Sequence, residues 1–411
     1  MAAPAIDNFE MTAALADLTD WLIQQGLENT PVQTWLAECC NRLVQAGIPL
    51  QRVNLSTRAH HPEIGAVAFR WFRDAETESF EYRRSTDVGD EFRQSPLFYL
   101  LGNDIAELRQ RLDVPDPEHH FPMFDELRAK GSTDYFAAKR FFLKSDQALA
   151  TNPYRSEEGM TISMTTDAPG GFTDAQLDGL RALIAPISLT LKCGANRRMA
   201  EDVTAAYLGA DASRRVLSGD IMRGSCETIP AVIWYFDLRG FTVLSESLPG
   251  EAIIDLLNAY FSLAVDAVEE FGGNVLKFMG DGMLAIFDLN EVPQAHLKAV
   301  EAACSLRDAF EALNALRSAE GKPTTGFTLS LHAGDVLYGN IGGTSRLDFT
   351  VIGPAVNTTA RILGMCGAVG QTIVISSVVA RPLLESRADL VSLGTYRLRG
   401  VSDRQELFTL D

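Results

Sequence analysis

Two aspartates stand where a protein can hold acidic oxygens around divalent metal ions. Asp237 ends the apolar run 231–236, and Asp281 lies between Gly280 and Gly282 after a second apolar run. Two carboxylates brought close together raise each other's pKa and disfavour the ionised pair, a cost that divalent metal removes. The pattern therefore predicts a site for divalent metal. The alternative interpretation is a surface turn and an unrelated aspartate at a strand end.

A third run lies further along the chain. Residues 348–353 read Asp-Phe-Thr-Val-Ile-Gly, and Asn357 and Arg361 follow. The three runs in this order, with the closing segments 398–401 and 407–408, resemble the catalytic domain of the class III nucleotidyl cyclases from Ile229 to Leu410. The resemblance implies an α+β fold, with a ferredoxin-like palm sheet covered by helices, and a nucleotide cyclase activity.

The resemblance also implies which residues bind metal and phosphate. Asp237 and Asp281 would each bridge two Mg²⁺ ions, which Mn²⁺ can replace, and the Leu238 carbonyl would add a ligand. Backbone amides at the start of the next helix would hold a triphosphate, as helix N-termini hold anions. The residues implied for phosphate binding are Gly240, Phe241, Thr242 and Arg399.

Asn357 and Arg361 are four residues apart on a helix that Pro354 opens, so both side chains point the same way. The reaction that the family performs is attack of a ribose 3′-hydroxyl on the α-phosphorus of a nucleoside triphosphate, in line with departing pyrophosphate. By resemblance, Arg361 would stabilise the transition state, where a forked cation suits the charge on the equatorial oxygens. Asn357 would orient the ribose. A solvated Asn and Arg on a helix are the alternative.

Lys277 and Asp348 occupy the two positions with which members of the family recognise the nucleotide base. Adenine presents a donor at N6 and an acceptor at N1, which match a carboxylate and an ammonium group. Guanine would set its O6 acceptor against the carboxylate and leave buried groups unpaired. Guanine-selective relatives carry Glu and Cys-like residues instead. We therefore expect ATP as the substrate and cyclic AMP as the product, with a guanylate cyclase as the alternative.

The family builds each site from two catalytic domains, and this chain carries each required position once. We therefore expect a homodimer with two equivalent sites. A degenerate cyclase domain that only dimerises or regulates would lack a metal Asp or Arg361, and none is missing. A diguanylate cyclase would need a Gly-Gly-(Asp/Glu)-Glu-Phe turn, where residues 272–275 read Gly-Gly-Asn-Val.

Residues 1–192 have a mixed pattern, and residues 229–411 hold the cyclase motifs. Two helical stretches come first, and a final helix starts near Thr173 or Asp174. Between them lie strand candidates at 52–56, 66–72, 79–84, 135–143 and 161–165. This is the element order of a GAF-like α/β sensor domain. A small molecule or a protein would then regulate the enzyme through this domain. The alternative is an α+β dimerisation domain without a ligand.

Residues 193–228 are predicted to form a helical linker. Met199, Val203 and Tyr207 recur at i, i+4 and i+8, a narrow apolar stripe that fits two parallel helices packed together. A break is expected from Gly209 to Ser213. The alternative is a helix that docks on its own domain.

Composition and charge restrict which partners, cellular location and cysteine or histidine sites we expect. The chain has 411 residues, more than one core usually supports, and an apolar content of 46%. Its charge of −18 argues against nucleic acid and anionic membranes as partners. We see no membrane span or signal peptide and expect a cytoplasmic protein. The six cysteines and six histidines are spaced for neither a disulfide framework nor a metal site.

Overall fold

The computed structural model describes residues 8–59, 61, 64–84, 89–103, 105–114, 121–142 and 159–411. The chain divides into two compact units, Met1–Val203 and Thr204–Asp411. Within the described ranges, none of the helices combines the length and apolar character that a bilayer-spanning segment needs. His60, His119 and His120, which the sequence suggested were loop residues, lie outside these ranges.

The described part of the amino-terminal unit is a six-stranded antiparallel sheet in the order β3-β2-β1-β6-β5-β4. Its elements are α1 (Asn8–Glu28), α2 (Val32–Gln45), β1 (Leu50–Arg58), β2 (Ile64–Phe72), β3 (Glu78–Arg83), α3 (Asp90–Arg93), α4 (Pro96–Gly102), β4 (Glu107–Arg111), α5 (Pro122–Ala129), β5 (Asp134–Phe141), β6 (Gly159–Thr166) and α6 (Asp174–Leu208).

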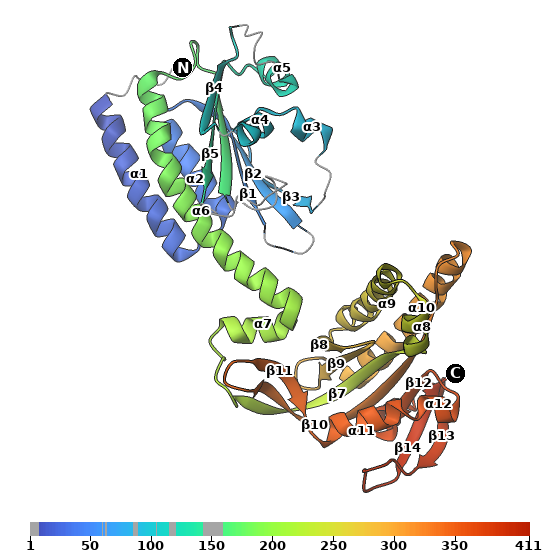
Figure 1. Cartoon of the computed structure of the whole chain (residues 1–411). Coiled ribbons are helices and arrows are strands. Elements are labelled where there is room, and N and C mark those ends of the chain that lie inside the picture. The colour runs from blue at the N-terminus through green and yellow to red at the C-terminus, as the bar shows by residue number, and fades with distance from the viewer. Residues whose placement is uncertain are drawn as a thin grey trace. The chain divides into compact units, whose positions relative to one another are not determined.

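Helices cover this sheet unequally. The long helices α1, α2 and α6 lie on one side, and the short helices α3, α4 and α5 lie on the other (Figure 1). Alternate residues of the central strands, such as Val53, Leu55 and Phe69, face the long helices and form the main core with them. A smaller cluster joins α4 and α5 to β5 through residues such as Phe124 and Tyr135.

The helix α6 begins with the cap that the sequence indicated. Thr173 Oγ1 accepts a hydrogen bond from the Gln176 amide, and the Gln176 side chain accepts one from the Thr173 amide, which is a capping box. The helix then runs without interruption to Leu208, so one helix stands where we expected a domain helix followed by a separate linker helix. The predicted break occurs at Gly209, whose φ is +85°. The boundaries at residues 192 and 228, and the GAF identity, stay predictions.

The carboxy-terminal unit contains an eight-stranded sheet in the order β13-β14-β12-β10-β7-β9-β8, with β11 paired to β10. Its elements are α7 (Ala210–Leu217), β7 (Cys226–Arg239), α8 (Phe241–Ser247), α9 (Gly250–Glu270), β8 (Asn274–Met279), β9 (Gly282–Asp288), α10 (Ala295–Ala319), β10 (Gly326–Gly342), β11 (Leu347–Ile352), α11 (Pro354–Leu363), α12 (Cys366–Val369), β12 (Ile373–Ser376), α13 (Ser377–Ala380), a 3₁₀ turn (Arg381–Leu383), β13 (Leu390–Tyr396) and β14 (Gln405–Leu410).

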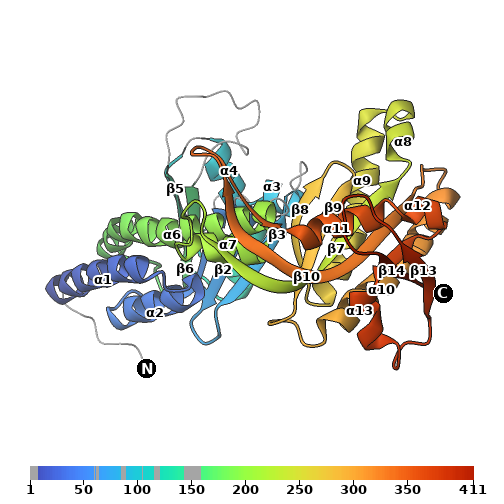
Figure 2. The ribbon, with the colours of Figure 1, turned by 90° about the horizontal axis from the view of Figure 1, so that it is seen from below.

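The centre of this unit confirms the predicted palm sheet. The order β7-α9-β8-β9-α10-β10 along the chain, with β10-β7-β9-β8 side by side in space, is the ferredoxin-like arrangement. The α+β fold class is therefore confirmed. The strand β10 runs from Gly326 to Gly342 and is the long curved strand seen in Figure 2.

The strand β7 is buried on both faces because apolar residues fill nearly every position from Ile229 to Phe236. Trp234 and Phe236 pack against α9 and α10, which cover one side of the sheet. Ile233 and Ala231 point to the other side, where α7 and α11 pack. Since this series continues through Tyr235 to Asp237, the Asp237 carboxylate points to the side that carries α11.

Candidate active site

The two aspartates that the sequence suggested as metal ligands come together at one end of the sheet. Asp237, near the end of β7, lies directly opposite Gly282 of β9. Asp281 is the second residue of the two-residue turn between β8 and β9. The Leu238 amide donates a 3.1 Å hydrogen bond to the Asp281 carbonyl, which fixes this turn against β7. The structure therefore brings together the two aspartates that the sequence analysis paired.

Glycines make this approach possible. Gly280 opens the turn with a φ of +66°, a conformation that other residues rarely adopt. A Cβ atom on Gly282 would lie 3.0 Å from the Phe236 carbonyl oxygen and 3.1 Å from Oδ2 of Asp237. A larger residue would therefore press directly on the carboxylate.

The electrostatic environment of the pair disfavours negative charge. Burial and, to a smaller extent, the neighbouring charge of Asp281 together raise the pKa of Asp237 to about 6. Burial and the same two carboxylates raise the pKa of Tyr235. Among the ion pairs of the described residues, none brings a Lys or Arg to Asp237 or Asp281. The site therefore favours an added cation.

The donor set fits Mg²⁺. Within the described part of the chain, no three His, Cys, Asp or Glu side chains gather into a complete protein cage. Mg²⁺ is usually held by one or two carboxylates together with water and substrate phosphates, so a pair of aspartates suffices. The predicted contribution of the Leu238 carbonyl stays a prediction.

The segment after Asp237 turns sharply into a short helix. Gly240 adopts the left-handed conformation, with a φ of +69°, and α8 begins at Phe241. The first amides of a helix have no intrahelical acceptor, so those of Phe241 and Thr242 are available to a ligand. Their predicted contact with phosphate stays a prediction.

Lys277 and Asp348 are joined, although 71 residues separate them in the chain. The Lys277 Nζ atom donates to Oδ2 of Asp348 at 2.8 Å, across from β8 to β11. Their side chains keep 31% and 56% of their surface exposed, so a ligand can reach both. The structure thus brings the predicted base-reading pair together.

Asn357 and Arg361 lie on the exposed side of α11. The opposite side of that helix is buried, with the Ser330 hydroxyl donating to the Thr359 carbonyl at 3.0 Å. In the described residues, neither the Asn357 nor the Arg361 side chain has a hydrogen bond or an ion pair within the chain. Both side chains are therefore exposed on the same face of the helix, and the spacing had predicted that they point the same way.

Arg399 is not joined to the other predicted residues by any contact in the described chain. It is exposed in the loop between β13 and β14. Two strands, β12 and β10, separate β14 from β7, which carries Asp237. Its predicted role at the triphosphate stays a prediction.

A polar cluster that we did not predict holds α7 against the base-reading strands. The Tyr338 hydroxyl donates to Oδ2 of Asp211 at 2.7 Å and accepts from Asn274 at 3.2 Å. The Arg215 guanidinium donates to Asp211 and lies 5.0 Å from the centre of the Tyr338 ring. Burial, followed by the Asp211 contact, raises the pKa of Tyr338. We call these residues, with Phe349, the α7 clamp.

The α7 clamp touches the strands that carry Lys277 and Asp348. Asn274 is in β8 with Lys277, and Phe349 follows Asp348 in β11. The rings of Tyr338 and Phe349 meet edge to face, 4.7 Å apart. Asp211 and Arg215 at i, i+4 were a visible signal of a paired helix face, but the sequence does not reveal their partner on β10.

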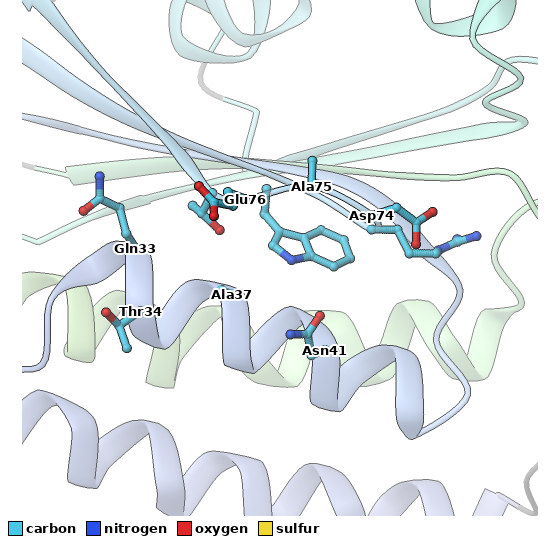
Figure 3. Close-up of a pocket in the computed structure, with 10 residues that line it drawn as sticks. Gln33, Thr34, Ala37, Asn41, Asp74, Ala75 and Glu76 are labelled. Atoms are coloured by element: carbon cyan, nitrogen blue, oxygen red, sulfur yellow. The ribbon is translucent and has the colours of Figure 1, made fainter.

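A surface pocket lies in the amino-terminal unit, between α2 and the β2–β3 connection (Figure 3). Gln33, Thr34 and Asn41 line it from the helix, and Asp74 and Glu76 line it from the opposite side. Arg73 also lines it, but its guanidinium already donates to both oxygens of Asp167.

A family model described as the adenylate and guanylate cyclase catalytic domain matches residues 226–411. An adenylate cyclase of Anabaena cylindrica is 35% identical over 164 residues, which cover 39% of this chain and 32% of the relative. Adenylate cyclase 1 of Rhizobium meliloti is 27% identical over 178 residues, covering 42% of this chain and 26% of the relative. The matches thus span about a third or less of the curated relatives.

Solved structures also resemble the carboxy-terminal half. The adenylyl cyclase CyaB from P. aeruginosa is 25% identical, with a TM-score of 0.42, over 46% of this chain and 96% of that chain. The guanylyl cyclase Cya2 is 30% identical, with a TM-score of 0.40, over 45% of this chain and 93% of that chain.

The ferredoxin-like sheet and the paired aspartates are features that this unit shares with the nucleotide cyclase catalytic domain that the sequence resembles. The family match agrees with this, since residues 226–411 are similar to adenylate and guanylate cyclase catalytic domains. The matched segment starts where β7 starts, three residues before the boundary that the sequence suggested.

Proposed function

We propose that this chain is an adenylate cyclase that converts ATP to 3′,5′-cyclic AMP and pyrophosphate. The observation that carries the choice of base is the contact between Lys277 and Asp348. A carboxylate accepts from adenine N6, and an ammonium group donates to N1. Before the nucleotide binds, Lys277 donates a hydrogen bond to Asp348. Adenine replaces this one hydrogen bond with two, one to each side chain.

The chemistry requires the 3′-hydroxyl of ATP to lose its proton, bond to the α-phosphorus and displace pyrophosphate as the α–β bridging bond breaks. Asp237 and Asp281 would hold two Mg²⁺ or Mn²⁺ ions. When bound, these ions supply charge neutralisation and lower the pKa of the attacking hydroxyl. Asn357 orients the ribose, and Arg361 stabilises charge on the equatorial oxygens.

The proposed active form is a homodimer with two equivalent sites. The acidic pair has no cationic partner among the described residues of its own chain, and Arg361 has no carboxylate partner there. If each site lies between two catalytic domains, the second copy supplies Arg361 to the acidic pair of the first copy. The β10–β11 ribbon also leaves Leu337, Leu347 and Ile352 exposed by 43%, 39% and 45%, which favours burial against another chain.

The amino-terminal unit is proposed to regulate the enzyme through α6, Gly209 and α7. A Cβ atom on Gly209 would lie 2.7 Å from the Val275 carbonyl oxygen, so the chain passes close against β8 at this turn. The α7 clamp then connects this segment to the strands that carry Lys277 and Asp348. A shift of α7 would therefore move the base-reading pair, and the proposed regulator is a small molecule or a protein.

The direct test is turnover by the purified full chain. With ATP and Mg²⁺ or Mn²⁺, we expect cyclic AMP and an equal amount of pyrophosphate, and much less product with GTP. Preference for GTP would replace the proposal with a guanylate cyclase. A folded dimer that turns over neither nucleotide would leave a catalytically silent regulatory module.

A further inference from the structure

The amino-terminal sheet has a polar side that is largely buried. Along β1 the apolar residues Val53 and Leu55 face the long helices, so Arg52 and Asn54 point to the other side. On β6 the same alternation places Ser163 and Thr165 on that side. Asn54, Ser163 and Thr165 keep only 7%, 1% and 0% of their surface exposed. A polar surface this buried needs partners for its hydrogen-bonding groups.

Two guanidinium groups meet on this polar side. Arg70 of β2 lies directly opposite Asn54, and Arg52 is two residues away along β1, so the two arginines are diagonal neighbours on one face. Both residues are partly buried. The Nη1 atom of Arg52 and the Nε atom of Arg70 are inaccessible to solvent and have no hydrogen-bond partner. Leaving such donors unsatisfied is costly.

Nearby acids do not neutralise this pair. Glu78 is the cross-strand neighbour of Arg70, yet no ion pair joins these two described residues. The Arg70 guanidinium instead lies over the Phe80 ring, 4.6 Å from its centre. Burial lowers the pKa of Arg52, and the charge of Arg70 lowers it further, while Glu126 of α5 acts more weakly in the opposite direction. Two like charges thus stand together in a poorly solvated place.

We propose that Arg52 and Arg70 bind a small molecule that carries a phosphate or carboxylate group, on the side of the amino-terminal sheet opposite α1, α2 and α6. A planar guanidinium binds either group with two parallel hydrogen bonds. An anion between the two arginines would satisfy the unpaired Nη1 and Nε donors and offset their mutual repulsion. The amide of Asn54 and the hydroxyl of Ser163 on neighbouring strands offer further polar contacts.

The pocket of Figure 3 is a weaker candidate for such a ligand. It lies beside α2, on the other side of the sheet, and its guanidinium, Arg73, is already held by Asp167 and by the Leu50 and Pro49 carbonyls. An anion there would have to displace an existing carboxylate. Among the described residues, no carboxylate is paired with Arg52 or Arg70, so an anion there would displace none.

The test uses the full chain in EDTA, so that the catalytic aspartates hold no metal. Thermal unfolding is measured in sodium chloride, inorganic phosphate and succinate at matched ionic strength. Arg52→Gln and Arg70→Gln each remove one guanidinium group. Arg83→Gln, at an exposed position of β3, is the matched control. Arg52→Lys keeps the positive charge but lacks the two parallel donors of the guanidinium group. This variant replaces the neutral ones in the test if they fail to fold.

We expect phosphate or succinate to raise the unfolding temperature above that in chloride. The apparent affinity should fall at least about tenfold in each Gln variant and in Arg52→Lys, and stay unchanged in Arg83→Gln. A response to phosphate alone, or to succinate alone, identifies the ligand group. No response to either anion, or an equal response in wild type and all Arg52 and Arg70 variants, would overturn the proposal.

Discussion

Replacing Asp237 by Asn should stabilise the metal-free protein while abolishing turnover. The pKa of Asp237 rises from an ordinary value of 3.8 to about 6 because of burial and the charge of Asp281. Such a rise corresponds to about 3 kcal/mol if the carboxylate feels it fully. Partial exposure of the side chain screens the interaction and leaves about 1–2 kcal/mol. For a unit of this size, the unfolding temperature should rise by about 4 °C.

The stability that Asp237→Asn gains over the wild type should depend on pH in a defined direction. Because the folded-state pKa of Asp237 is the higher one, the folded wild type binds more protons than the unfolded chain between pH 3.8 and about 6. The wild type therefore loses stability relative to the variant as pH rises through this window. The difference should be absent below about pH 4 and complete above about pH 6.

Thermal unfolding of both proteins in EDTA, at several pH values from 4 to 8, measures this difference. Asp335→Asn, at an exposed position of β10, is the control and should show no such gain. Adding Mg²⁺ should stabilise the wild type and leave Asp237→Asn unchanged. If Asp237→Asn is less stable than the wild type at pH 7.5 in EDTA, the reasoning about the paired carboxylates is wrong.

Three further predictions concern the base, the metal and the α7 clamp. Lys277→Glu combined with Asp348→Cys should shift the ratio of kcat/KM for GTP over ATP by at least about 100-fold, and an unchanged ratio would contradict the proposed base contacts. Chelation by EDTA should stop turnover, and excess Mg²⁺ or Mn²⁺ should restore it; persistent activity in EDTA would contradict metal dependence. Tyr338→Phe should destabilise the carboxy-terminal unit by about 1 kcal/mol. It should also raise KM for ATP more than it lowers kcat, and an unchanged KM would remove the clamp from substrate positioning.

The sequence predicted most of the candidate site because its parts are local. The two-residue turn at Asp281 and the i, i+4 spacing of Asn357 and Arg361 are properties of short segments, and both exist in the structure. The contact between Lys277 and Asp348 is long-range, and only the family resemblance indicated it. The contact of Tyr338 with Asp211 could not be predicted, because it depends on how α7 packs against β10.

In the amino-terminal unit the sequence indicated the apolar strands but missed smaller elements. The strand candidates at 52–56, 66–72, 79–84, 135–143 and 161–165 correspond to β1, β2, β3, β5 and β6. The missed strand β4, Glu107–Arg111, has one apolar residue, so its pattern gives no alternation to detect. The missed helix α4 did carry a signal, since Ser95 caps it and Pro96 occupies its first turn. The unpaired Arg52 and Arg70 depend on strand register and could not be inferred.

Mixing two inactive variants tests the proposed shared site most directly. Asp237→Ala removes a metal ligand and Arg361→Ala removes the transition-state cation, so each homodimer should be inactive. When the two chains are co-expressed, half of the dimers should be mixed and contain one intact site of two, which gives about a quarter of wild-type cyclic AMP formation. Recovery near that level is the predicted result. No recovery, in a sample where mixed dimers are demonstrated by differently tagged chains, would contradict it.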